Sequence, residues 1–190
     1  MAAKIATFFN KSKSRTDSID FILMLLSFSG IMNTMITENL QEFYNIAPDG
    51  CIICIDYGTR KSGIAFSDSN RLMSFPFCTI TANNMKDCVT QIKKIMDKKK
   101  PKSIVVGLPL YLNGLHSKQT DITKKFALLL NSVTNLPVFL QDERLTSRGA
   151  ENYLKDFSFN RKEREKMSDM TSASLILDIV IKRIKDISET

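Results

Sequence analysis

The chain has 190 residues, of which 43% are hydrophobic and 25% charged, which suits one globular domain or one domain plus an extension. This composition excludes a chain disordered throughout, a collagen and a disulfide-dense miniprotein. The formal net charge is +7 and is uneven. Residues 1–50 carry four basic and five acidic groups, net −1, so residues 51–190 carry net +8. A basic domain attracts polyanions, which makes nucleic acid a candidate partner.

Residues 1–34 differ from the rest and are predicted to be an extension that precedes a domain at residues 35–190. A basic stretch from Lys11 to Arg15 precedes an apolar run from Phe21 to Met32. The run has about twelve residues, fewer than the roughly 20 that a membrane-spanning helix needs. Three interpretations stay open: a start-site artefact, a helix packed on the domain, and a targeting segment.

The predicted elements of the domain begin with a helix over residues 35–46, where apolar side chains recur at helical spacing. A meander of three strands follows, at residues 51–57, 63–67 and 73–79. Strands at residues 103–107 and 137–140 then alternate with helices, which are expected at 89–96, 122–133, 147–154 and from near Ser168 onward. This order indicates an α/β fold with a mixed five-stranded sheet and helices on both faces.

The four cysteines are predicted to be reduced thiols. Cys51 and Cys54 have the spacing of a redox or metal motif, but they lie in a strand, where residues three apart point to opposite faces. The sequence has a single histidine, His116, and no second such cysteine pair to complete a tetrahedral zinc site. We interpret His116 as a surface residue and expect a reducing, cytoplasmic location.

Acidic residues follow two of the predicted strands. Asp56 ends the first strand, Asp142 and Glu143 follow the last, and Asp169 lies in the first turn of the final helix. If the central strands are parallel, their carboxyl ends form the edge where open α/β sheets bind ligands. Converging carboxylates repel one another unless a cation neutralises them, and oxygen ligands suit Mg²⁺ or Mn²⁺. Two such ions would activate a water and stabilise the leaving oxygen of a phosphodiester. The pattern therefore favours a metal-dependent nuclease.

Each of these residues also has a structural interpretation. An acid can end a strand by accepting hydrogen bonds from a turn, or it can stabilise the N-terminus of a helix. Gly58 lets the chain turn after Asp56 and approach a ligand closely, and we predict that Gly58 and Arg60 contact the substrate. The lysines from Lys98 to Lys102 are either a solvated helix end or a contact with backbone phosphates.

Four blocks of the sequence resemble the YqgF/RuvX family, whose members are assigned to pre-16S rRNA processing and were formerly labelled Holliday junction resolvases. The resemblance covers about residues 50–185 in order. The blocks are Ile55-Asp-Tyr-Gly-Thr-Arg-Lys-Ser-Gly-Ile-Ala65, Val105-Val-Gly-Leu-Pro-Leu110 with Asn113-Gly114, Asp142-Glu-Arg-Leu-Thr-Ser147, and Asp169 with Ala173 and Ile176-Leu177. The resemblance implies an RNase H-like fold and a cytoplasmic enzyme that matures the 5′ end of 16S rRNA.

The resemblance also assigns roles to the acids. It implies that Asp56 is the principal metal-binding carboxylate, that Glu143 or its neighbour Asp142 is the acid after the last strand, and that Asp169 is the helix acid. We accordingly expect Asp56, Glu143 and Asp169 to be catalytic, and all four acids to be candidate ligands of Mg²⁺ or Mn²⁺.

Further roles follow from the same resemblance. Gly107 to Pro109 would shape the floor of the pocket, and Arg144 would position a phosphate or brace the carboxylates. One departure is Ser172, which stands where the family usually has an alanine. A second departure is that residues 1–31 have no counterpart in the family.

The principal hypothesis is a metal-dependent phosphodiesterase that acts on precursor 16S rRNA, as a monomer or homodimer and without a membrane. One alternative is a nuclease for DNA junctions with the same acids, which would need a dimer to present two sites. Another is a nucleic-acid-binding module without activity. Asp-x-Gly-Thr also opens the phosphate loop of actin-like ATPases and sugar kinases. The chain lacks the second glycine-rich nucleotide motif that these proteins need.

Overall fold

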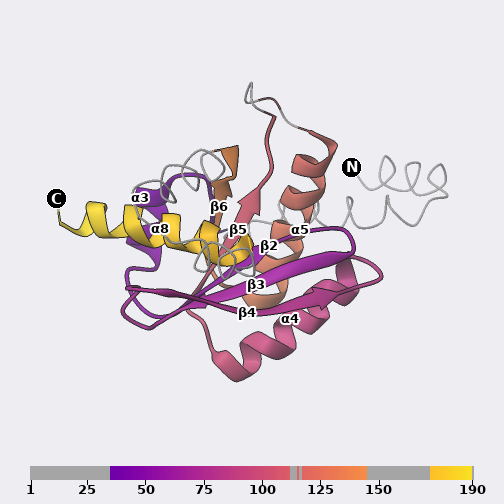
Figure 1. The fold of residues 1–190 in the computed structure, drawn as a ribbon, viewed down its shortest axis with the longest axis horizontal. Helices are drawn as coiled ribbons and strands as arrows, with labels where there is room; N and C mark the ends of the chain where they lie inside the picture. Colours follow the sequence, from indigo (N-terminus) through magenta and orange to yellow (C-terminus); the bar gives the residue numbers. More distant parts are fainter. Residues whose placement is uncertain (1–34, 112–114, 116, 145–171, 190) are drawn as a thin grey trace, which may run out of the picture. The chain divides into compact units, whose positions relative to one another are not determined.

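A six-stranded mixed sheet has the strand order β1-β6-β5-β2-β3-β4 (Figure 1). The computed structural model describes residues 35–111, 115, 117–144 and 172–189. The four strands β1, β6, β5 and β2 are parallel, and β2, β3 and β4 form an antiparallel meander. The strands are β1 (Ile36–Thr37), β2 (Ile52–Asp56), β3 (Lys61–Ser67), β4 (Ser74–Thr81), β5 (Ser103–Leu108) and β6 (Val138–Asp142).

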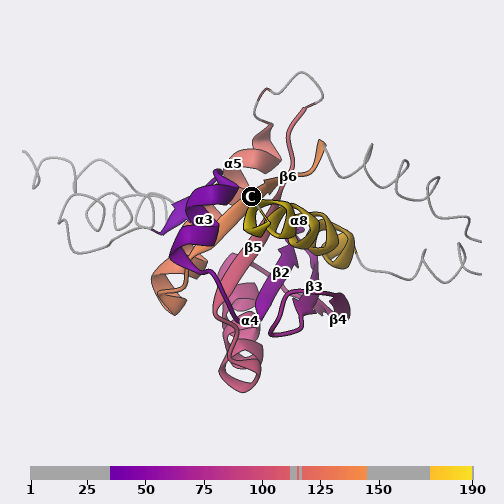
Figure 2. The same ribbon diagram turned by 90° about the vertical axis from the view of Figure 1, so that its left-hand side faces the viewer.

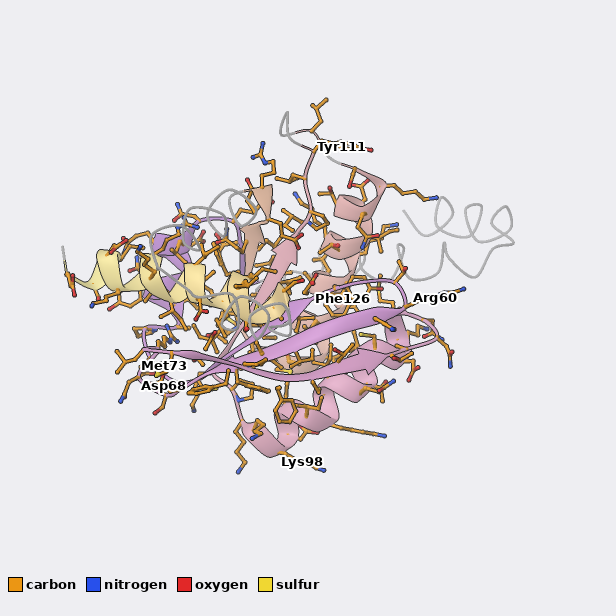
Figure 3. The ribbon with its side chains drawn as sticks, viewed as in Figure 1. Arg60, Asp68, Met73, Lys98, Tyr111 and Phe126 are labelled. Atoms are coloured by element: carbon orange, nitrogen blue, oxygen red, sulfur yellow. The ribbon has the colours of Figure 1, made fainter. Side chains whose placement is uncertain are left out.

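Helices cover both faces of this sheet, because side chains of the central strands alternate between two apolar clusters. One cluster joins the sheet to α4 and α5, and Phe126 of α5 lies in it (Figure 3). The other joins the sheet to α3 and α8, which contact each other (Figure 2). The helices are α3 (Leu40–Ile46), α4 (Met85–Lys99), α5 (Lys118–Thr134) and α8 (Ser172–Ser188).

The predicted α/β fold with helices on both faces is confirmed, and the five predicted strands are all present. A sixth strand, β1, was not predicted, because two residues are too few to show alternation. It pairs Ile36 with Val138 at the edge of the sheet, so the helix predicted from residue 35 begins only at Leu40. The Asn39 side chain caps that helix by accepting hydrogen bonds from its first turn.

Several predictions fall on residues outside the described ones. These are the interpretations of residues 1–34, the helix at 147–154 and the start of the last helix before Ser172. The described residues all belong to one unit of the chain, Met35–Thr190. None of the described helices has the length and apolar character that crossing a membrane requires.

Cys51 and Cys54 lie on opposite faces of the sheet, as strand alternation predicts. All four cysteines are free thiols. Cys54 lies in the cluster beneath α8, whereas Cys51 packs against the cluster on the opposite face. Burial raises the pKa of both thiols.

Arg71 connects the turn between β3 and β4 to the loop that leads into β2. Its side chain is only 6% exposed, and its guanidinium donates to the carbonyl oxygens of Gly50 at 2.8 Å and Ala47 at 2.7 Å. A further bond of 2.5 Å reaches the carbonyl of Asp49. A buried guanidinium is stable only when its donors are satisfied, and backbone carbonyls satisfy them here.

Candidate active site

Three neighbouring parallel strands bring the two candidate acids to the same face of the sheet. Cys54 of β2, Val105 of β5 and Phe139 of β6 all lie in the cluster beneath α8. Because side chains alternate along a strand, Asp56 lies on this face, two residues after Cys54. Glu143 follows β6 in the same alternation, and its backbone N–H donates to the carbonyl oxygen of Leu108 at 3.1 Å. The ends of β2 and β6 therefore direct Asp56 and Glu143 toward the N-terminal part of α8.

Gly107, which lies between them on β5, provides the room for the Glu143 carboxylate. A Cβ atom at this position would collide with Oε1 of Glu143 and would lie only 2.8 Å from Cδ1 of Ile176. Gly107 and Ile176 are both buried, so a side chain at position 107 would have to displace the Glu143 carboxylate. The role of Gly107 in shaping the floor of a pocket stays a prediction.

The electrostatics of Asp56 and Glu143 show that they interact. Burial raises the pKa of Asp56, and a hydrogen bond with the Ser172 side chain partly offsets this. Burial, followed by repulsion from Asp56 and then from Asp142, raises the pKa of Glu143 from 4.5 to about 7. The buried thiol of Cys54 lies near both, since its pKa is raised first by burial and then by these two carboxylates. Holding two repelling carboxylates half-buried is unfavourable unless they bind a cation.

Asp142 has a different environment, although it is adjacent to Glu143. The Arg144 guanidinium donates from Nη2 to Oδ2 of Asp142 at 2.7 Å and from Nε to both carboxylate oxygens at 3.1 Å. This hydrogen-bonded pairing lowers the pKa of Asp142. Of the two roles expected for Arg144, bracing a carboxylate is the one that this geometry matches. The binding of a phosphate by Arg144 stays a prediction.

Gly58, Arg60 and Pro109, the other described residues of the predicted site, lie in loops that follow strands. A Cβ on Gly58 would collide with the carbonyl oxygen of Lys61, so the turn after β2 itself requires glycine. Arg60 is exposed in that turn, away from α8 (Figure 3). The carbonyl oxygen of Pro109 accepts a hydrogen bond from the hydroxyl of Thr120 in α5. Substrate contact by Gly58, Arg60 and Pro109 stays a prediction.

Two predicted residues, Asp169 and His116, lie outside the described residues. Sequence reasoning missed the contact of Ser172 with Asp56, although Ser172 stood out as a departure from the family pattern. It also missed Asp178, an acid on α8 whose pKa is raised by burial and which accepts hydrogen bonds from Ser74 of β4. A signal for Asp178 was present in the sequence, because it is an acid within an apolar helical run.

The oxygen ligands of the site fit a hard divalent cation. Asp56 and Glu143 offer carboxylate oxygens on one face, and both have raised pKa values that a bound cation would reverse. The described residues contain no cluster of three or more metal-ligating side chains.

Known proteins resemble both the sequence and the fold. A family model described as "RuvX: Holliday junction resolvase" matches residues 50–183. Relatives from Rickettsia peacockii and Rickettsia typhi, both named "Putative pre-16S rRNA nuclease", are each 44% identical over 80% of this chain and cover 100% and 97% of their own length. The solved structure of the yeast mitochondrial Holliday junction resolvase Ydc2 is 13% identical, with a TM-score of 0.51 over 90% of this chain and 95% of that one. This likeness concerns the fold alone, and it confirms the expected RNase H-like fold.

Proposed function

The chain belongs to the RuvX family, and we propose that it is a metal-dependent nuclease that hydrolyses phosphodiester bonds in precursor 16S rRNA. The observation that supports this most directly is the convergence of Asp56 and Glu143 on either side of Gly107. The names of the 44% identical relatives favour RNA as the substrate. An enzyme with this role would act in the cytoplasm.

We assign the metal-binding role to Asp56 and Glu143, with Asp169 as a third candidate ligand. Mg²⁺ or Mn²⁺ suits these oxygen ligands, and when bound such ions activate water and stabilise the leaving oxygen of a phosphodiester. Glu143 is the stronger candidate than Asp142, because its carboxylate lies against Gly107 on the same face of the sheet as Asp56.

The residues around the acids hold them in position. Ser172 orients Asp56 by a hydrogen bond, and Gly107 gives the Glu143 carboxylate its space. Ile176 covers the same glycine from α8 and limits access of water from that side. Half-burial of both carboxylates strengthens their interaction with any cation between them, because the local dielectric constant is lower than in water.

Cleavage assays with wild-type protein and the Asp56→Asn variant would test this proposal. Each protein is incubated with Mg²⁺ or Mn²⁺ and either a 5′ fragment of precursor 16S rRNA or a four-way DNA junction. We expect metal-dependent cutting of the RNA by the wild type and a loss of roughly a thousandfold or more in the variant. Binding of RNA should persist or tighten, since a negative charge is removed.

Asp97→Asn is the matched control, because Asp97 is exposed on α4 and only forms a surface ion pair of 3.3 Å with Lys93. Normal cleavage by Asp56→Asn would refute the metal assignment. Cutting of the junction but not of the RNA would replace the proposed substrate with structured DNA. Binding of both substrates without cutting would identify a non-catalytic module.

A further inference from the structure

The edge strand β4 exposes two aromatic side chains next to a cluster of lysines. Phe75 is 49% exposed and Phe77 is 46% exposed, although both belong to a strand of the central sheet. Lys98 and Lys99, both exposed, end the neighbouring helix α4 (Figure 3). We call these four residues the aromatic-basic patch.

The side chains of the patch gather on one face of the sheet. Phe75 pairs with Phe66 across β3 and β4, and the ring of Phe77 meets the ring of Phe66 edge-on with centroids 5.3 Å apart. Phe66 belongs to the cluster beneath α4 and α5, so both exposed rings lie on the α4 face. Nζ of Lys99 lies 5.0 Å from the centroid of the Phe77 ring, which joins the basic and aromatic parts of the patch.

The backbone of β4 is poorly suited to adding a strand from another protein. β4 stands at the end of the strand order, but Pro76 lacks an N–H, and the pairing with β3 is irregular between Ile64 and Ala65. Proline and bulges on an edge strand prevent edge-to-edge pairing. A partner can therefore contact the exposed rings, whereas the strand edge provides few backbone groups for hydrogen bonds.

The charge around these rings favours an anionic partner. Residues 98–102 contain four lysines and no acid, and β4 itself has no charged residue. Aromatic faces beside flexible cations are the combination that binds single-stranded nucleic acid, because bases stack on the rings while cations neutralise phosphates. Lys99 can leave the Phe77 ring for a phosphate, since its side chain is a flexible four-carbon chain.

We propose that the aromatic-basic patch is a second binding site for the nucleic acid, which holds a single-stranded segment of the substrate away from the bond that is cut. This inference rests on the proposed nuclease function. Phe75 and Phe77 stack bases, and Lys98 and Lys99 contact phosphates.

The sheet separates this patch from the candidate active site. Asp56 and Glu143 lie on the α8 face, whereas the patch lies on the α4 face and two strands away from β2. A strand of RNA that reaches both has to pass from one face of the sheet to the other. The patch should therefore lower KM for substrates with a long single-stranded segment and should leave kcat unchanged.

The test measures fluorescence anisotropy of a labelled oligouridylate with full-length protein in EDTA, so that binding is separated from cleavage. The double variant Phe75→Leu and Phe77→Leu keeps apolar side chains but removes the stacking faces, and we expect binding to weaken by roughly tenfold. The double variant Phe75→Tyr and Phe77→Tyr should restore it. Replacing Lys98 and Lys99 by Gln should reduce the slope of log K against log salt by about 1.4, given about 0.7 per phosphate for single strands.

Ile46→Ala, which removes an apolar side chain that is 44% exposed on α3, and Lys185→Gln on α8 are the matched controls. Unchanged binding by the leucine variant, with metal-dependent RNA cleavage by the wild type intact, would overturn the patch and leave the nuclease function standing. Sedimentation that shows a wild-type dimer dispersed by the leucine variant would overturn it in favour of contact with a second copy. If the wild type neither binds RNA nor cuts it, the proposed function fails together with the patch.

Discussion

Acidic side chains lie both in the turn between β3 and β4 and at the ends of β2 and β6. The pKa of Asp68 in the turn is lowered, whereas the pKa values of Asp56 and Glu143 at the strand ends are raised. In the turn, Asp68 accepts hydrogen bonds from the backbone N–H groups of Met73 at 2.8 Å and Leu72 at 2.7 Å. Desolvation raises the pKa of Asp68, but these bonds together with one from Asn70 outweigh it, so the pKa is lowered. At the strand ends, burial and mutual repulsion raise the pKa of Glu143 to about 7.

This difference separates acids that hold the fold from acids that are set up to bind a cation. The chain's own donors satisfy the Asp68 carboxylate, so its charge stabilises the folded state. The charges of Asp56 and Glu143 oppose folding, and a protein keeps such groups where they serve binding or catalysis. Asp142 resembles Asp68 in this respect, because Arg144 supplies its donors.

The strongest test of the comparison replaces neighbouring acids one at a time. Glu143→Gln should reduce metal-dependent cleavage by roughly a thousandfold, because it removes a charge that the cation needs. Asp142→Asn should reduce cleavage by less than about tenfold, since it removes the pairing with Arg144 and a weak repulsion of Glu143 but leaves both assigned ligands in place. Single-turnover rates on the RNA fragment check both values. Equal losses in the two variants would remove the distinction between them.

The dependence of stability on pH gives a second test. Between pH 4.5 and about 7 the folded, metal-free protein holds a proton on Glu143 that the unfolded chain has released. The stability that this proton gives the folded state is therefore fully present below pH 4.5 and is lost as pH rises to about 7. Thermal unfolding in EDTA should show this decline, and Glu143→Gln should flatten it.

Divalent metal should reverse the same trend. Ligation needs the deprotonated carboxylate, so Mg²⁺ or Mn²⁺ should raise Tm more at pH 8 than at pH 5.5. At pH 8, free metal at 100 times Kd should raise the free energy of unfolding by about 2.7 kcal/mol. A metal effect that is equal at the two pH values would contradict binding at Glu143.

Replacing acids away from the strand ends should have the smallest effects, and these should be on stability alone. Asp68→Ala removes the acceptor of three backbone N–H groups and should lower the free energy of unfolding by about 1–2 kcal/mol. Denaturant unfolding measures this loss, and RNA cleavage should be unchanged. Asp97→Asn, on the surface of α4, should lower stability by less than about 0.5 kcal/mol. A loss of cleavage in Asp68→Ala would show that the turn contributes to the site.

Much of the site could be predicted because strand alternation is a local property. The apolar run that ends in Asp56 placed this acid at a strand end, and the family pattern singled out Gly107 as part of the site. The choice between Asp142 and Glu143 could not be made from sequence, because it depends on where β6 ends and on which of the two acids Arg144 reaches. Ser172 was beyond reach for a similar reason, since its contact with Asp56 depends on how α8 packs on the sheet.

In the fold too, the sequence predicted the elements that their own residues define and missed those that depend on distant contacts. The central strands β2 and β5 have continuous apolar runs, so they were predictable. The strand β1 has two residues, and only its pairing with β6 defines it. The helix α3 was predicted from its apolar stripe, but its start depends on Asn39, which caps it after the chain leaves β1.

The hydrogen bonds of Arg71 couple the local unfolding of two segments that lie far apart in the sequence. Its guanidinium holds the carbonyls of Ala47 and Gly50, which belong to the loop before β2, while its own backbone belongs to the turn after β3. Loss of the loop would leave the Arg71 guanidinium without acceptors, and loss of the turn would leave the loop carbonyls without donors. The two segments should therefore exchange their amide hydrogens as one cooperative unit. Because the loop leads directly into the strand that ends in Asp56, that unit would also protect the acid's position against local fraying.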